Sequence, residues 1–585
     1  MESVLWTLRR ADGVELLGGL WRPFAIGLFL YYSGYLGVWI SALVRAAGLA
    51  RFRPLTAATA PDVLVVIPTL LRSQADLDSL RDAASTALTN RYPGRVVVCL
   101  AIDGSDDAPP LVAELSAWAA AHRPPVLVAT LPERSGKGVA VAAGLARAEH
   151  AVRTGELPAL PPVFFNMDAD GVLGPRALER MVARLVRPGA VTRQRPMIVA
   201  SNVMVRRAHY WAGWRKFARL PHQLALQVAR EYMTSISITR NNLGLLPVTG
   251  VSGALYCTWT ELHQLQARHA GFMHALRWRD VAAWWLGAPP PRFATWTGEP
   301  NVHATAGPGD DTWLAWLAMM ARWRGDRLDV ELPRSPLHAL GRLLRSFIVR
   351  PIAYDPLARV YTATPTTVRG LWKQRVRWNS SRLWLAQRFG LTPWFAWHLG
   401  AWIMLDLALV FLIHATILAG VLLWPLADRP ATWLSLLVLG YLSTLVIRGS
   451  ATLLAMIQDH DVRGHWHKLL ALPLAGMFHF VFNIATTTWG LIHEVLGFGV
   501  NTHFAPEATL ARAGVGRPAL AYRMTRAARL CWRALRHGDV PPGRFWFGWH
   551  ASAWTVEGHA GWTDPRASVG RGGVRPSPRA RRTAR

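Results

Sequence analysis

The chain has 585 residues, of which 51% are hydrophobic, and its 65 Lys and Arg against 36 Asp and Glu give a formal net charge of +29. This length exceeds that of one small domain, and a mean hydropathy of +0.16 indicates membrane segments beside a soluble part. The basic residues lie near apolar segments and along the C-terminal tail, which favours anionic lipid as partner over nucleic acid. Three cysteines without metal-ligand spacing, Cys99, Cys257 and Cys531, argue against a disulfide framework.

The first apolar segment runs from Phe24 to about Leu49 and carries almost no charge before Arg45. A helix crosses a bilayer with about 20 apolar residues. Because the segment is longer than the apolar core of a cleaved signal peptide, we expect residues 1–50 to hold one transmembrane helix.

Residues 51–390 are expected to form a soluble α/β domain. Buried-looking strands are predicted in DVLVVIP, RVVVCLAID, PVLVAT and VFFNMDAD, and helices in LDSLRDAASTALT and KGVAVAAGLARAEHAV. Apolar strands that alternate with helices predict a mostly parallel sheet covered on both faces. Ligands of such sheets bind beyond the carboxyl ends of the strands, where Asp103, Asp168 and Asp170 stand.

Three further apolar stretches follow at about residues 399–426, 432–457 and 469–496. We expect residues 391–498 to hold interfacial helices and about three transmembrane helices. Residues 499–585 form an Arg-rich tail that is predicted to be partly disordered.

The stretch FFNMDADGVLGP places two carboxylates, Asp168 and Asp170, side by side after an apolar run. Like charges this close raise each other's pKa unless a positive group lies between them. A divalent cation that holds a phosphate ester would be such a group. Asp103, in AIDGSDD, can accept hydrogen bonds from a nucleobase or ribose, although an ordinary Asp-Gly turn looks the same.

Lys137 lies between glycines at the start of a predicted helix, and the other lysines are only Lys216, Lys373 and Lys468. Backbone N–H groups, a helix dipole and an ammonium together suit a phosphate. The spacing differs from a Walker sequence. A solvated lysine at a helix N-terminus is the alternative interpretation.

Two later segments have the composition of a ligand site. PVTGVSGALY, residues 247–256, is small enough for close approach of a ligand, although a plain loop looks alike. In AGPGDDTWLAWLAMMARW, Asp310 and Asp311 open an amphipathic helix. Helix capping explains one of these acids, and a general base explains the second.

The segment LWKQRVRWNSSRLW, residues 371–384, precedes the late apolar stretches. Arg377 can form paired hydrogen bonds to a diphosphate, and Trp378 offers a flat face for a sugar ring. The alternative is a basic and aromatic helix at the membrane interface.

These motifs occur in the order IDGSDD, SGKG, DAD, TGVSGA, GDD and QRVRW. In this order and spacing the chain resembles family 2 glycosyltransferases of the processive, membrane-integrated kind, which include cellulose, hyaluronan, chitin-oligosaccharide and alginate synthases. The resemblance covers about residues 60–390 and the flanking membrane layout. It implies a GT-A-like catalytic domain beside an α-helical transmembrane domain.

The resemblance also implies roles for single residues. On the donor side, Asp103 corresponds to the contact with the base, Lys137 to a residue near the diphosphate, Asp168 to a nucleotide ligand and Asp170 to the metal ligand. Asp311 corresponds to the general base. The remaining residues take the diphosphate (Gln374, Arg377) or the acceptor (Trp378, Gly250, Ser252, Gly253).

The expected reaction is an inverting and processive transfer of sugar from a UDP- or GDP-sugar, with Mg²⁺ or Mn²⁺, to a growing polysaccharide or lipid-linked acceptor. A hard cation matches the oxygen ligands. We expect a bacterial-type inner membrane location with a cytoplasmic catalytic domain, contact with membrane lipids, and room for accessory export proteins. Two alternatives remain: a single-transfer enzyme that makes a glycolipid, and a non-catalytic surface binder.

Overall fold

A computed structural model describes most of residues 52–234, 251–268, 310–330 and 351–378, parts of residues 441–489, and the short pieces 276–277, 341 and 539–540. The gaps within these ranges include residues 123–125, 133–135, 188–194, 252, 326 and 377. Of the predicted site residues, Gly250, Ser252 and Arg377 lie outside the described residues. The predicted apolar segments at residues 24–49 and 399–426, and nearly all of the tail, lie outside them too.

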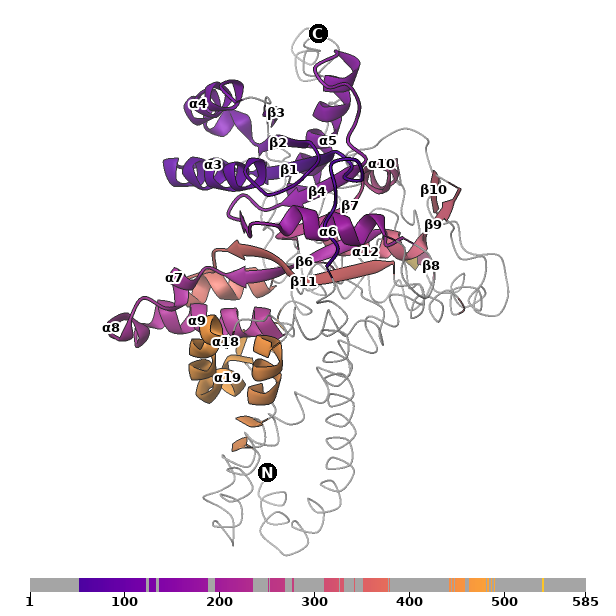
Figure 1. The fold of residues 1–585 in the computed structure, drawn as a ribbon. Coiled ribbons are helices and arrows are strands. Elements are labelled where there is room, and N and C mark those ends of the chain that lie inside the picture. The colour runs from indigo at the N-terminus through magenta and orange to yellow at the C-terminus, as the bar shows by residue number, and fades with distance from the viewer. Residues whose placement is uncertain are drawn as a thin grey trace, which may run out of the picture.

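One eight-stranded sheet forms the centre of the described part of the chain (Figure 1). Its strands are β1 (Val63–Thr69), β2 (Val96–Asp103), β3 (Leu127–Leu131), β4 (Val163–Met167), β5 (Val172–Leu173), β6 (Ile198–Val205), β7 (Leu255–Trp259) and β11 (Ile352–Thr362), in the order β3-β2-β1-β4-β7-β6-β11-β5. Parallel pairing joins β3, β2, β1 and β4, and also β6 and β11. The prediction of a mostly parallel α/β sheet is confirmed, with β7 inserted antiparallel between β4 and β6.

Helices lie on both sides of this sheet. They are α3 (Gln74–Leu88), α4 (Pro109–Ala120), α5 (Lys137–Arg153), α6 (Ala177–Val186), α7 (Arg207–Tyr210), α8 (Trp214–Phe217), α9 (Leu220–Tyr232), α10 (Thr260–Arg268) and α12 (Asp310–Met320), with a 3-10 turn η1 at Ser105–Asp107. A further helix covers residues 368–376. Two small antiparallel pairs join β9 (Ala321–Arg324) to β10 (Arg327–Val330) and β8 (Leu276–Arg277) to β12 (Asp539–Val540).

The strand β1 explains how the core is divided between the two faces of the sheet. All seven of its residues are buried, and successive side chains point to opposite faces. Leu64 and Val66 pack in a cluster with α5, whereas Val65 and Ile67 pack in a larger cluster that includes α3 and α6. An almost wholly apolar strand is therefore required here, because helices cover both faces.

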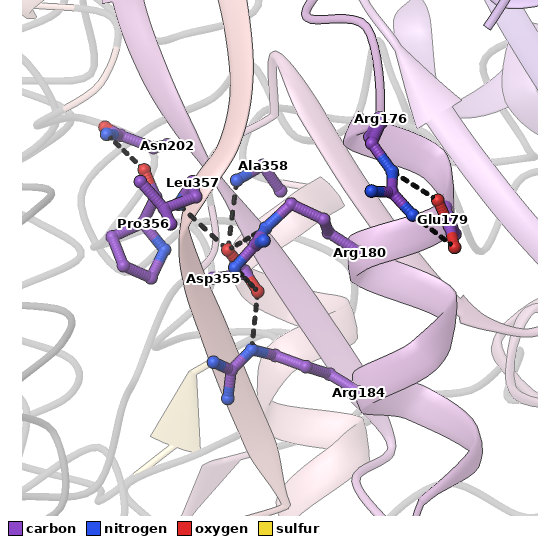
Figure 2. Close-up of polar contacts among 9 residues, drawn as sticks. All are labelled: Arg176, Glu179, Arg180, Arg184, Asn202, Asp355, Pro356, Leu357 and Ala358. Carbon is purple, nitrogen blue, oxygen red and sulfur yellow. Dashed lines mark hydrogen bonds and ion pairs between the residues drawn. The ribbon is translucent and has the colours of Figure 1, made fainter. Parts of the chain in front are cut away.

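A buried carboxylate joins α6 to β11 (Figure 2). Asp355 accepts hydrogen bonds from Arg180 Nε at 3.0 Å and from Arg184 Nε at 2.7 Å. Its Oδ1 also accepts the backbone N–H groups of Leu357 and Ala358, at the place where the register of β11 against β6 shifts. The side chain of Asp355 is only 1% exposed. Asp355 thus offsets the charges of two arginines and also satisfies backbone N–H groups at the irregularity in β11.

Elements from late in the chain pack beneath α9. They are α18 (Val462–His465), η6 (Trp466–Ala471) and α19 (Leu472–His479), drawn in orange in Figure 1. Gln227 Nε2 donates to the carbonyl oxygen of Ala471 at 2.7 Å, and Met233 packs against Met456. Among the described residues, no helix has both the length and the apolar character that a membrane crossing requires.

Candidate active site

The candidate site lies at the edge of the sheet where the parallel strands end. β2 ends at Asp103, and β4 ends directly before Asp168. Because β1 is parallel to both strands, the two carboxylates share one edge, as the sequence predicted. β7 runs antiparallel to β4, so its first residues, which follow Gly253, lie at this same edge. Open α/β sheets bind their ligands at such an edge.

Lys137 begins α5 and joins two other segments of the site. Its Nζ donates to Asp168 Oδ1 at 2.5 Å and to the carbonyl oxygen of Gly253 at 2.9 Å. The two charged side chains are about one third exposed, and pairs with such exposure contribute only about 0.2–1 kcal/mol to stability. Because this pair contributes little free energy, another anion can take the place of Asp168 beside Lys137 at a small cost in free energy.

Gly253 is held on several sides. Its carbonyl oxygen also accepts a hydrogen bond from Nδ2 of the buried Asn166 at 2.9 Å. A Cβ atom at this position would lie 3.1 Å from Asp311 Oδ2 and 3.2 Å from Lys137 Nζ. A side chain at this position would press on the ends of both charged side chains, so glycine is the residue that leaves Asp311 and Lys137 where they are.

Gly253→Ala is expected to lower turnover by about tenfold while the fold stays intact. The added methyl group must displace Asp311 or Lys137 by a few tenths of an ångström, and a displacement of about 1 Å can cost about 10²-fold in rate. Nucleoside diphosphate release measures the effect. Gly341→Ala is the matched control, because a Cβ there meets no atom of the described residues within 4 Å. Equal turnover of Gly253→Ala and Gly341→Ala would show that turnover does not depend on the close approach of Asp311 and Lys137 to Gly253.

Asp311 lies at the N-terminus of α12, as the sequence predicted. The backbone N–H of Thr312 donates to Asp311 Oδ1 at 2.7 Å. This bond fixes one carboxylate oxygen, while Oδ2 is the oxygen nearer to Gly253. The geometry therefore presents one oxygen of Asp311 toward the Lys137 side of the site.

Asp103 is buried at the end of β2 and accepts a hydrogen bond from the backbone N–H of Gly136 at 2.9 Å. Gly136 has a φ of 97°, a backbone conformation that favours glycine. The bond holds the turn directly before Lys137. Besides its predicted contact with a base, Asp103 thus has a role in orienting the start of α5.

Asp170 is fixed by groups from two other strand ends. Its Oδ2 accepts hydrogen bonds from Thr362 Oγ1 at 2.7 Å and from the backbone N–H of Ala363 at 3.1 Å, and Arg206 donates to its carbonyl oxygen. Burial raises the pKa of Asp170, and the charge of Asp168 raises it further, although the hydrogen bonds from Thr362 and Ala363 oppose this. A cation near the two carboxylates would relieve this repulsion.

The QRVRW segment lies partly in the helix of residues 368–376. Gln374 is half-buried, and among the described residues its Oε1 has no hydrogen-bond partner. Trp378 is 39% exposed, and its ring centroid lies 6.3 Å from that of Tyr232.

Burial raises the pKa of Tyr232 to about 12; the charge of Arg375 lowers this pKa, and the charges of Glu231, Asp170 and Asp168 raise it. The charges of Asp170 and Asp168 thus act on the end of α9.

Two residues of the site, Asn166 and Thr362, were not predicted from the sequence. Asn166 is one polar residue within an apolar strand, and Thr362 ends a strand that lies far along the chain. A polar residue inside VFFNM was a usable hint, because a buried amide needs a partner. Nothing marked Thr362.

Comparison with known proteins gives one family match. Residues 64–240 match the model described as Glycosyl transferase family 2. No curated protein matches the chain. Among solved structures, the chain is similar to the mannosyltransferase PcManGT from Pyrobaculum calidifontis in complex with GDP-Man and Mn²⁺, with 18% identity, 76% of this chain and 99% of that chain covered, and a TM-score of 0.37.

Proposed function

We propose that this chain, a nucleotide-sugar glycosyltransferase with a family 2 domain in residues 64–240, is an inverting and processive enzyme. It transfers sugar from a UDP- or GDP-sugar to a growing polysaccharide, which it also exports across a membrane. The observation that carries this proposal is the convergence of Lys137, Asp168 and Asp311 around the carbonyl and Cα of Gly253. Asp168 and Asp311, which are 31 and 174 positions from Lys137 in the sequence, thereby lie close to it around one glycine.

The donor side of the proposed reaction needs compensation of the diphosphate charge. Asp168 and Asp170 offer oxygen ligands, and the raised pKa of Asp170 fits a place that favours a positive charge. Mg²⁺ or Mn²⁺ suits such hard donors, and when bound it supplies Lewis-acid stabilisation of the departing diphosphate. Lys137 adds an ammonium, which leaves Asp168 for the diphosphate. Asp103 keeps the turn before Lys137 in place and lies where a base can reach it.

Asp311 is the proposed base. It takes the proton of the acceptor hydroxyl as the acceptor oxygen bonds to the anomeric carbon, while the bond from that carbon to the diphosphate oxygen breaks and its electron pair leaves with the nucleoside diphosphate. One displacement without an enzyme nucleophile inverts the anomeric centre. The hydrogen bond from Thr312 holds the carboxylate while it receives the proton.

The acceptor side is assigned to Trp378, whose exposed indole offers a stacking surface for a sugar ring. Gly250, Ser252 and Gly253 are proposed to line the path of the acceptor, and Gln374 and Arg377 to reach the diphosphate. Support comes from Tyr232, because the charges of Asp168 and Asp170 act on its phenol and its ring lies beside Trp378.

Membrane attachment is proposed from apolar side chains late in the chain. Among residues 441–489, Val446 is 67% exposed, Met477 64% and Ile457 52%. Such side chains gain free energy from a lipid environment, by roughly 25 cal/mol per Å² of apolar area removed from water. We propose an inner-membrane protein with its catalytic domain in the cytoplasm, and this arrangement allows for accessory export proteins.

The test is a panel of UDP- and GDP-sugars offered to membranes that contain the full chain. We expect nucleoside diphosphate release with one donor, dependence on Mg²⁺ or Mn²⁺ with loss in EDTA, and a labelled polymer. A product of one added sugar that extracts into organic solvent would replace the polymer with a glycolipid. No release with any donor would contradict the catalytic proposal.

A further inference from the structure

The last turn of α9 and the QRVRW segment are joined by a buried ion pair. Arg375 Nη1 donates to Glu231 Oε1 at 2.9 Å, and Nη2 donates to Glu231 Oε2 at 2.6 Å. The side chains are 8% and 15% exposed. Two parallel charge-assisted bonds fix the plane of the guanidinium as well as its position. Glu231 thus determines the orientation of Arg375.

Arg375 in turn supports Trp378. Its Cζ lies 4.8 Å from the centroid of the Trp378 ring, within the range of a cation–π contact. Tyr232, the neighbour of Glu231 in α9, lies beside the same indole, with an angle of 31° between the rings. The indole is therefore held through two consecutive residues of α9, while 39% of Trp378 stays exposed.

Helix α9 is itself anchored away from the site. Gln227 donates to the carbonyl oxygen of Ala471, and Met233 packs against Ala455 and Met456. The carboxylate of Glu231 consequently stands on a helix that is fixed from both the sheet side and the late elements. A rigid support of this kind is what a precisely oriented side chain needs.

Fold stability alone gives little reason for this pair. The desolvation of two buried charges largely cancels their attraction, and apolar residues of similar volume often serve stability equally well. The pair does hold the guanidinium of Arg375 at a fixed angle to the ring of Trp378, three residues further along the chain. The position of the Glu231–Arg375 pair, next to the ring of Trp378, fits a role in orienting that ring better than a role in stability.

We infer that Glu231 is a positioning residue, which orients Arg375 so that the exposed face of Trp378 receives the sugar ring of the acceptor. This inference rests on the proposed function. It assigns α9 to acceptor alignment, whereas the donor contacts lie on β2, β4 and α5.

Glu231→Gln in the full chain is the test, with the donor that the panel identifies. Two quantities are measured: nucleoside diphosphate released, and labelled sugar found in product. A misplaced Trp378 lets water replace the acceptor, so we expect the ratio of sugar in product to nucleoside diphosphate released to fall by about tenfold, with KM for the donor within about twofold of wild type. A merely structural role would lower both quantities together and leave the ratio unchanged.

Two further variants sharpen the result. Trp378→Ala should lower the same ratio. The double variant with Glu231→Gln should lower the ratio no further than Trp378→Ala alone, because Glu231 acts on the acceptor only through Trp378. Glu156→Gln, which removes the charge that Arg147 Nη2 of α5 contacts just beyond the end of that helix, is the control and should leave the ratio unchanged. An unchanged ratio in Glu231→Gln, or additive losses, would overturn the inference alone. No turnover in the wild type would overturn the proposed function and this inference with it.

Discussion

Asp311→Asn is expected to lower the rate of sugar transfer by about 10²–10⁴-fold, the range that a positioned general base contributes. The amide keeps an oxygen that can accept the hydrogen bond from the Thr312 backbone, so the geometry of α12 is retained. It cannot take the proton of the acceptor hydroxyl. Sugar incorporation at saturating donor measures the loss, and binding of the nucleoside diphosphate should change by less than about threefold.

Asp106→Asn is the matched control, because Asp106 is an exposed carboxylate in η1 near the same edge of the sheet. Its activity should stay within about twofold of wild type. Turnover by Asp311→Asn at the wild-type rate would assign the base to another group.

Asp355→Asn is expected to destabilise the domain by about 3–5 kcal/mol, because loss of one partner leaves buried charge on Arg180 and Arg184 without compensation. At roughly 2–4 °C per kcal/mol, the midpoint of thermal unfolding should fall by about 10 °C. The buried thiols of Cys99 and Cys257 report unfolding through their reaction with a thiol dye. Asp62→Asn, which breaks the half-exposed pair with Arg95, is the control and should cost less than about 1 kcal/mol.

The stability difference between wild type and Asp355→Asn should depend on pH. Burial raises the pKa of Asp355, but the charges and hydrogen bonds of Arg184 and Arg180 outweigh it and hold the pKa below the usual value. A depressed pKa adds stability that is present above the pKa of about 3.9 in the unfolded chain and is lost as pH falls through the lower folded value. The two proteins should therefore differ most above about pH 5 and converge in stronger acid. A difference that is constant down to pH 2 would contradict this account.

The local elements of the domain were predictable because each has a clear period. The run DVLVVIP predicted β1, and its side chains are all buried; KGVAVAAGLARAEHAV predicted α5, which runs from Lys137 to Arg153. Helices and buried strands that alternate leave few arrangements apart from a covered parallel sheet. The meeting of Asp103 and Asp168 at one edge follows from that arrangement.

Pairing between distant segments was not predictable. β7 lies antiparallel between β4 and β6, although the sequence around it indicated only a flexible loop, and β11 joins the sheet from beyond a long Trp-rich connection. Hydrophobic period reports which face is buried and says nothing of direction or neighbour. The partners of Asp355 were hidden for the same reason, since Arg180 stands 175 residues away.

The sequence predicted where the carboxylates of the candidate site lie, but only a part of their contacts. Lys137 was expected to meet a phosphate, and the structure adds its bonds to Asp168 and Gly253. Within QRVRW, the sequence pointed to Gln374, Arg377 and Trp378. It gave no sign of a role for Arg375, whose side chain is hydrogen-bonded to Glu231. Helical spacing shows which residues share a face, but only the packed structure shows which face another helix covers.

The reversed direction of β7 has a consequence for how such a catalyst can diversify. Asp103 and Asp168 stand where parallel strands finish, whereas the Gly253 turn stands where β7 starts. The backbone N–H of Asp168 donates to the carbonyl oxygen of Ala254 at 3.0 Å, so an insertion between Gly253 and Leu255 would displace Asp168 as well. Variation in length that leaves this edge of the sheet intact therefore has to fall outside these three residues.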